Sequence, residues 1–474
     1  MQTTSRRQFL ATAALGAASL AMPARSWAQV PGANSDIRIG VVGFNGRGKS
    51  HIDGFSKLPG VRLVALCDAD RNVLDRAAKA LGHPVEKYID IRKLLENKDI
   101  DAISIATPNH WHSLMTIWGC QAGKDVYVEK PISHNAFEGR QAVNAARKHN
   151  RIVQAGTQSR SNAGLREALE WVRAGNIGKI KVSRGLCYKP RPSIGYVTEP
   201  QPIPASVDYD LWCGPAPMDP LMRLKLHYDW HWVWSTGNGD LGNQGIHQMD
   251  IARWAIGKAA LSPKVISVGG RLGYKDNGET ANTQMIVHDY GDVLLIFEVR
   301  GLPAKSDVRE MDKYRGQSVG HVIECENGYL AGTTVHDNDG KEIKKFSARG
   351  EDNHFGNFIK GVRSRKSADL NADILEGHLS SALCHTGNIS HRLGREQNPE
   401  EIREGLKSDK AAQETLARME SHLDANGVDL KKTKLTIGPL LTMDGKKERF
   451  IGNDKANQLI TRNYRAPYIV PEKV

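Results

Sequence analysis

Lys130 is the side chain of this sequence with the clearest capacity for chemistry. It follows the apolar run Val126–Val128 and Glu129, and Pro131 comes directly after it. A run of this kind predicts a buried strand, and ligands bind at the carboxyl edge of open parallel sheets. An amine delivered to that edge can exchange a proton with a substrate or stabilise a developing negative charge.

A glycine-rich turn, Gly43–Gly48, follows the strand predicted at residues 37–42. Glycines let the backbone approach a pyrophosphate, and the N-terminus of the next helix favours its negative charge. Compared with the pattern G-x-G-x-x-G, Asn45 replaces the middle glycine, and asparagine tolerates left-handed backbone geometry. The turn therefore predicts a dinucleotide site.

Asp68 ends the next predicted strand, about 20 residues beyond the turn. A carboxylate at this place accepts the ribose hydroxyls of NAD and repels a 2′-phosphate. NAD is therefore the predicted cofactor, and the nearby Arg71 leaves NADP open.

These side chains require a parallel sheet to position them. Apolar runs alternate with helical patterns of about a dozen residues, as in repeated βαβ units. We predict strands at 37–42, 61–67, 100–106, 125–128 and 151–155, with helices at 47–58, 71–81, 113–122 and 137–149. Residues 29–157 are thus predicted to form a doubly wound α/β Rossmann domain.

The pattern changes after Thr157. Alternating strands and the hairpin signals Gly291-Asp292 and Asn327-Gly328 predict an α+β domain on an open, mostly antiparallel sheet. We divide the chain into a signal peptide (1–28), a Rossmann domain (29–157), a substrate and oligomerisation domain (158–395) and a C-terminal extension without an assigned role (396–474).

The N-terminus carries an export signal pattern. Arg6 and Arg7 precede an alanine-rich apolar stretch and the small-x-small site Ser26-Trp27-Ala28. This layout predicts a twin-arginine (Tat) signal, and the stretch is too short to remain as a membrane span after cleavage. A folded protein exported in this way can take its cofactor with it to the periplasm.

Composition excludes several classes of function. Hydrophobic residues make up 40% of the chain and charged residues 25%, as in ordinary globular proteins. The net charge of +12 is scattered among acids, so no nucleic-acid partner is predicted. The six cysteines and the histidines lack the spacings of metal sites, so no metal is predicted.

In these features the chain resembles the Gfo/Idh/MocA oxidoreductases, the family of glucose–fructose oxidoreductase and inositol dehydrogenase. The resemblance covers residues 37–395 and rests on the Gly43–Gly48 turn, Thr107–His112, Glu129-Lys130-Pro131 and Gly242–Asp250. It implies a Rossmann domain followed by an open antiparallel sheet that often supports homo-oligomers.

The resemblance also implies the roles of individual residues. Lys130 lies at the nicotinamide and the substrate, and His247 is a candidate acid or base. Asn243 stands where the family usually has an aspartate, and an amide cannot take a proton. Proton transfer is therefore assigned to Lys130 and His247.

Further site residues are predicted by group. Those expected to bind the substrate are Asn243, Asp250, Trp230 and His231, although tryptophans and helix carboxylates are often simply packed. Those expected to bind the cofactor are Gly43, Asn45, Gly46, Arg47, Gly48, Asp68, Thr107, Pro108, Asn109, His112, Glu129 and Lys130. His110 is expected in the active site together with His112.

The sequence thus predicts an exported NAD(P)-dependent oxidoreductase with a tightly bound cofactor. Hydride transfer would act on a hydroxyl or carbonyl of a sugar, sugar derivative or cyclitol. One alternative is an NAD-dependent glycosidase that oxidises a sugar transiently and eliminates a leaving group. A second, motivated by Asn243, is a non-catalytic sugar-binding protein.

Overall fold

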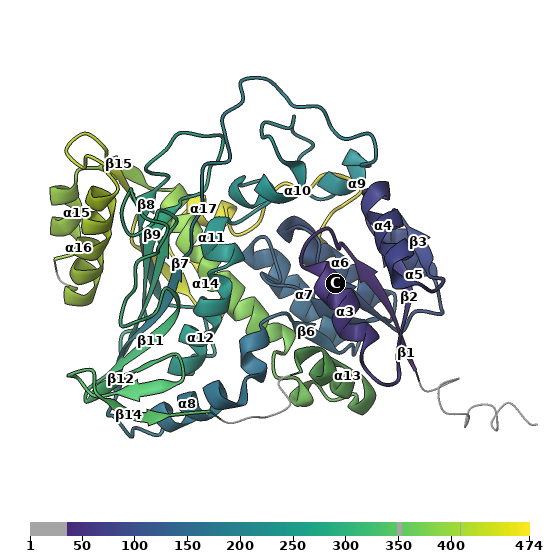
Figure 1. Ribbon diagram of the computed structural model, residues 1–474, viewed down its shortest axis with the longest axis horizontal. Coiled ribbons are helices and arrows are strands. Elements are labelled where there is room, and N and C mark those ends of the chain that lie inside the picture. Colours follow the sequence, from purple (N-terminus) through teal and green to yellow (C-terminus); the bar gives the residue numbers. More distant parts are fainter. Residues whose placement is uncertain (1–35, 348–352, 408) are drawn as a thin grey trace, which may run out of the picture.

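The computed structural model describes residues 36–347, 353–407 and 409–474 (Figure 1). The predicted Tat signal, residues 1–28, lies outside the described residues. Two sheets stand at opposite ends of the molecule, and helices α7 (Ala136–Lys148) and α14 (Ile374–Arg392) pack together between them (Figure 1). Within the described residues, no helix is both long and apolar enough to cross a bilayer.

The first sheet confirms the predicted Rossmann domain. Its six strands are all parallel in the order β3-β2-β1-β4-β5-β6. The strands are β1 (Ile37–Val42), β2 (Val61–Cys67), β3 (Glu86–Tyr88), β4 (Ala102–Ile105), β5 (Asp125–Val128) and β6 (Val153–Ala155). The helices are α3 (Gly48–Ser56), α4 (Arg71–Leu81), α5 (Ile91–Glu96), α6 (His112–Gln121) and α7. The sequence missed β3 because this edge strand is polar and largely exposed.

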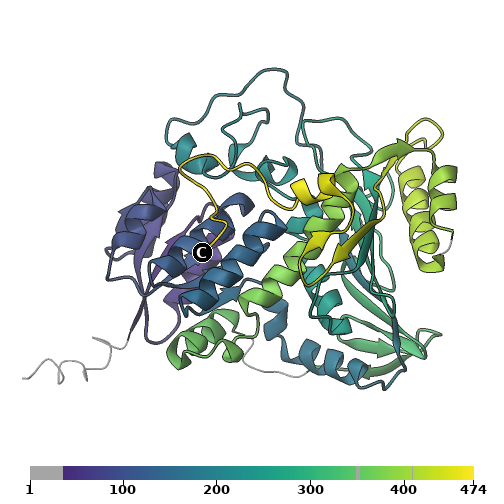
Figure 2. The ribbon, with the colours of Figure 1, turned by 180° about the vertical axis from the view of Figure 1, so that it is seen from behind.

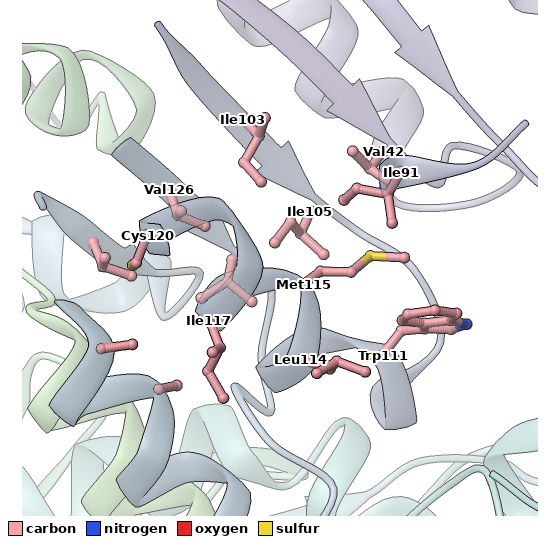
Figure 3. Close-up of a cluster of buried hydrophobic side chains, with 14 of the residues drawn as sticks. Val42, Ile91, Ile103, Ile105, Trp111, Leu114, Met115, Ile117, Cys120 and Val126 are labelled. Atoms are coloured by element: carbon pink, nitrogen blue, oxygen red, sulfur yellow. The ribbon is translucent and has the colours of Figure 1, made fainter. Parts of the chain in front are cut away.

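A core of buried hydrophobic side chains holds the carboxyl ends of the central strands in place. Ile103 and Ile105 of β4 point toward Met115 and Ile117 of α6, and Trp111 closes the cluster (Figure 3). All four residues of β5 are buried, as its continuous apolar run predicts for a strand covered on both faces. The residues that follow β4 and β5 therefore emerge at one fixed edge.

The second sheet is mostly antiparallel, as predicted; among its described strands only β7 and β10 pair in parallel. Its main strands are β7 (Ile180–Tyr188), β8 (Lys264–Gly270), β9 (Thr283–Asp289), β10 (Leu294–Arg300), β11 (Val319–Cys325), β12 (Gly328–Ala331), β13 (Thr334–His336) and β14 (Glu342–Lys345). The associated helices are α8 (Ala163–Arg173), α9 (Tyr209–Cys213), α10 (Leu226–Asp229), α11 (Gly239–Asn243), α12 (Ile246–Ile256) and α13 (His354–Ser364). Helices α12 and α14 pack on one face of this sheet.

The C-terminal extension adds β15 (Arg395–Gln397), α15 (Pro399–Gly405), α16 (Lys410–Ala425), β16 (Leu435–Ile437), β17 (Leu441–Asp444), β18 (Arg449–Phe450) and α17 (Asp454–Gln458). Helix α16 packs Leu416 and Met419 against Met285 and Ile296, on the sheet face opposite α14 (Figure 1). The chain thus covers part of its own open sheet.

The last residues return to the Rossmann domain (Figure 2). Tyr468 is buried in the core beside Trp111, and its hydroxyl donates to the Asp210 carboxylate of α9 at 2.6 Å. Tyr468 therefore links α9 to the core of the Rossmann domain beside Trp111. Helix α9 belongs to the long connection between β7 and α10.

Candidate active site

One cavity of about 450 Å³ lies at the carboxyl edge of the Rossmann sheet, and the second domain forms part of its wall. The Rossmann residues in its wall include Gly43, Asn45, Gly46, Arg47, Asp68, Asp90, Thr107, Pro108, Asn109, His112, Glu129 and Lys130. The second domain contributes Lys189, Arg191, Tyr228, Trp230, His231, Asn243, Gln244 and His247. The structure therefore brings together most of the residues predicted from the sequence.

The dinucleotide turn has the tight geometry that its glycines allow. Gly43 has φ of 75°, and a Cβ there would lie 2.7 Å from Thr107 Cγ2. A Cβ on Gly48 would lie 2.0 Å from the Gly43 carbonyl oxygen, so only a glycine lets the turn close here. Gly48 itself does not line the cavity. A Cβ on Gly46 would meet nothing within 4 Å. An open backbone before the α3 N-terminus fits a pyrophosphate.

Asp68 is held at the end of β2. Its carboxylate accepts hydrogen bonds from the backbone N–H groups of Phe44 at 3.1 Å and Asp70 at 3.0 Å. Burial raises the pKa of Asp68 to about 6, so the group remains ionised at neutral pH. A fixed carboxylate in the cavity wall fits the ribose of NAD.

An Asp68→Asn variant should bind NAD roughly tenfold more weakly, because hydrogen bonds to a charged acceptor are the stronger ones. Its preference should also move toward NADP, since the charge that repels a 2′-phosphate is gone. Titration of both cofactors measures the two effects, with Asp75→Asn on the exposed face of α4 as the control. Unchanged NAD affinity in Asp68→Asn would contradict this role.

Glu129 anchors the base of the cavity. Its buried carboxylate accepts from Arg47 Nε and Gln158 Nε2, each at 3.0 Å, and lies 3.0 Å from His51 Nε2. These partners hold the pKa of Glu129 well below its usual value despite burial. Glu129 is therefore a permanent anion that orients Arg47 and the neighbouring Lys130.

Lys130 projects from the end of β5 toward the second domain. Its Nζ donates to the backbone carbonyl oxygen of Asn243 at 2.9 Å. Burial lowers the pKa of Lys130 from its ordinary value, and the nearby Glu129 opposes this effect. An amine with a lowered pKa can exchange a proton with a substrate at accessible pH.

His247 lines the same part of the cavity from the first turn of α12. Burial, followed by the charge of Lys130, lowers the pKa of His247 to about 3. No hydrogen bond from another described side chain occupies its ring. His247 is therefore a neutral imidazole that can accept a proton from a bound molecule.

Trp230 and His231 form one aromatic wall. Their rings stack with centroids 3.6 Å apart, and Trp230 Nε1 donates to the His227 carbonyl oxygen at 3.0 Å. Burial lowers the pKa of His231 to about 3. The wall is thus rigid and uncharged, which suits the face of a ring-shaped substrate.

Two expectations need correction. Asp250 does not line the cavity: Arg160 donates to its two oxygens at 2.8 and 2.9 Å, and Ser380 donates to it at 2.7 Å. His110 also lies outside, with its ring nitrogens facing the carbonyl oxygens of Trp212 and Thr236. Spacing along the chain placed both near the site, but partners from other elements sequester them.

Asp250→Ala should lower the free energy of unfolding by about 3 kcal/mol, because it leaves the buried Arg160 without its main partner. Urea denaturation measures this change. Asp292→Ala, which removes an exposed ion pair with Lys258, should change little. A variant of Asp250 that keeps full stability but loses activity would place this residue in substrate binding after all.

Sequence reasoning missed Lys189 and Arg191, which follow β7 directly. Lys189 Nζ donates to Gln244 Oε1 at 2.9 Å, and Arg191 pairs with both oxygens of Asp240 at 2.6 Å. In the sequence, these residues are two cations at the start of a proline-rich connection. Cations in such connections usually lie on the surface, so the pattern did not indicate a site.

All six cysteines are buried and free. Among residues 36–347, 353–407 and 409–474, no group of three or more His, Cys, Asp or Glu side chains is arranged to hold a metal ion.

Comparisons with known proteins agree with this architecture. Residues 37–157 match the model of an oxidoreductase family with an NAD-binding Rossmann fold, and residues 177–422 match the C-terminal alpha/beta domain of an oxidoreductase family. The WlbA dehydrogenase of Bordetella pertussis, solved with NADH and UDP-GlcNAcA, shares the fold with a TM-score of 0.56 and 21% identity. That match covers 74% of this chain and 97% of the WlbA chain.

Two curated relatives are informative. The chain is 23% identical over 268 residues to the inositol 2-dehydrogenase/D-chiro-inositol 3-dehydrogenase of Lacticaseibacillus casei, covering 54% of this chain and 75% of the relative. It is 34% identical over 163 residues to a glycosyl hydrolase family 109 protein of Solibacter usitatus, covering 31% of this chain and 37% of the relative. The second match thus spans well under half of that protein.

Proposed function

The chain belongs to the Gfo/Idh/MocA family of NAD-binding oxidoreductases, and from this membership we propose that it interconverts a hydroxyl and a carbonyl group of a sugar, sugar derivative or cyclitol. The observation that carries the proposal is the placement of Lys130 and His247 in one cavity with the dinucleotide turn and Asp68. The inositol dehydrogenase relative supports a polyhydroxylated substrate.

The protein's own groups have a defined task in this reaction. When bound, NAD supplies the acceptor or donor of hydride at the substrate carbon. Oxidation also releases the hydroxyl proton, which either the Lys130 amine or the neutral His247 ring can accept. The resulting ammonium of Lys130 also stabilises negative charge on the substrate oxygen. Asn243 can hydrogen-bond a hydroxyl but cannot take this proton.

The protein is further proposed to be exported to the periplasm through the Tat route, which the Arg6-Arg7 motif supports. Outside the cytoplasm no supply of free NAD is expected, so the cofactor would be held tightly and regenerated within each cycle. An oligomer through the second sheet would have to use the area that α16 leaves uncovered.

A second candidate is a redox-assisted glycosidase, which the glycosyl hydrolase relative favours. In such a cycle a hydroxyl is oxidised, a leaving group is eliminated with loss of a neighbouring proton, and the carbonyl is reduced again. Lys130 and His247 are the groups of this cavity that can move those protons. The cycle returns the cofactor to its starting state, as an exported enzyme requires.

The test uses the processed protein purified from its host. Absorbance and mass spectrometry should find bound nicotinamide, and a panel of sugars, cyclitols and aryl glycosides should identify the reaction. Formation of reduced nicotinamide without release of the aryl group supports the oxidoreductase, and release without net reduction supports the glycosidase. A protein that neither copurifies with nicotinamide nor binds it when added would contradict both.

A further inference from the structure

At the substrate end of the cavity, nearby acidic side chains do not pair with every cationic side chain. Four cationic side chains line the cavity: Arg47, Lys130, Lys189 and Arg191. The two arginines are paired, Arg47 with Glu129 and Arg191 with Asp240. Among the described residues neither lysine forms an ion pair, and their nearest polar partners are the neutral oxygens of Asn243 and Gln244.

The acids in the cavity wall form no ion pair with these lysines. Among the described residues three acids line it, Asp68, Asp90 and Glu129, and Glu129 is the one that lies near Lys130. Asp68 and Asp90 belong to the nucleotide end, beyond β2 and β3, and Glu129 is shared by Arg47, His51 and Gln158. Lys189 is close enough to lower the pKa of Lys130. Asn243 also supplies no charge where a carboxylate would have balanced one.

Lys189 is the group of this pair that is free to bind a charged partner. An ammonium has three N–H donors, and Gln244 Oε1 accepts one of those of Lys189. Lys189 follows β7 directly and lines the cavity from the second-domain side. Because Lys130 is assigned to proton transfer, Lys189 is left to bind the substrate.

We infer that the substrate carries a carboxylate and that Lys189 binds it, so that the enzyme acts on sugar acids in preference to neutral sugars. This inference rests on the proposed function, since it places the substrate in the same cavity. A carboxylate has a single charge and two acceptor oxygens, which match the unpaired charge and the two remaining N–H donors of Lys189. A phosphate monoester would require further cations, and both cavity arginines are already paired.

The test compares sugars that differ only in this group, glucose with glucuronate and galactose with galacturonate. Binding to the NAD-loaded protein is measured by calorimetry, and turnover is measured by nicotinamide absorbance. The acids should bind roughly tenfold more tightly than the neutral sugars, as a charge-assisted hydrogen bond provides. Lys189→Met should abolish this difference, and Lys189→Arg should retain part of it.

Lys79→Met, on the exposed face of α4, is the matched control for the loss of one charge. All variants should keep their NAD content. Equal binding of acid and neutral sugars by the wild type, no binding of either acid, or a preference that survives Lys189→Met would each overturn the inference. Turnover of neutral sugars without such a preference would leave the proposed oxidoreductase function standing. Binding of the acids without any redox turnover would instead refute that function and keep Lys189 as a carboxylate site.

Discussion

Lys130→Ala is expected to lower kcat by roughly 10²–10⁴-fold, the usual contribution of a positioned acid or base. The amine reaches the second domain through the Asn243 carbonyl oxygen at 2.9 Å, and it adjoins His247. Its lowered pKa places the rising, acidic limb of the pH–rate profile for oxidation below the ordinary lysine value of 10.5. That limb should disappear in the variant, since activity requires the neutral amine to accept the proton.

Two controls separate chemistry from structure. Added ethylamine should partly restore turnover in Lys130→Ala, because a free amine can occupy the vacated space. NAD binding should remain intact, because the turn and Asp68 are untouched. If the variant kept full activity, the proton would belong to His247 alone, and His247→Ala would then be the inactive form.

Acidification is expected to destabilise the protein well above the pH at which carboxylates titrate. Five buried histidines have pKa values lowered by burial, His110, His231, His288 and His385 to about 3 and His321 to about 4. They stay neutral in the fold but take up protons in the unfolded chain below about pH 6.5. The unfolded state therefore binds more protons, and stability falls as the pH falls through this value.

Each such histidine costs about 1.4 kcal/mol by pH 5.5, so the five together cost about 7 kcal/mol. Asp68 opposes the trend, because its folded pKa of about 6 is raised and it gains its proton first in the native state. Thermal unfolding between pH 8 and pH 5 measures the effect. His288→Gln should show a shallower decline, and a melting temperature that stays constant down to about pH 4 would contradict this account.

The sequence was sufficient to predict the Rossmann domain, because its signals are local. An apolar run followed by glycines, as before Gly43, or by Glu129-Lys130-Pro131, fixes a strand end and the side chain that emerges there. The lining of the cavity by Asp68 and Lys130 follows from such positions, whereas Asn243 was located only through the resemblance to the family. Strand β3 escaped detection because an exposed edge strand needs no apolar pattern.

Contacts between distant elements were beyond this kind of reasoning. Asp250 has the spacing of a site residue, yet Arg160 and Ser380 from other elements take its oxygens. Lys189 has the appearance of a surface cation, yet the close approach of the two domains brings it into the cavity with Lys130. The extension after residue 396 has no motif, yet α16 covers the sheet and Tyr468 reaches the Rossmann core.

The sequence alone therefore determined that a lysine and a dinucleotide turn meet at one sheet edge, because hydrophobic periodicity and glycine geometry act over a few residues. Only the tertiary structure decided which charges are neutralised, since pairing depends on side chains brought within about 4 Å from separate elements. Although Lys189 and Arg191 are two residues apart in the chain, Arg191 forms an ion pair with Asp240 and Lys189 contacts only a neutral oxygen of Gln244 among the described side chains.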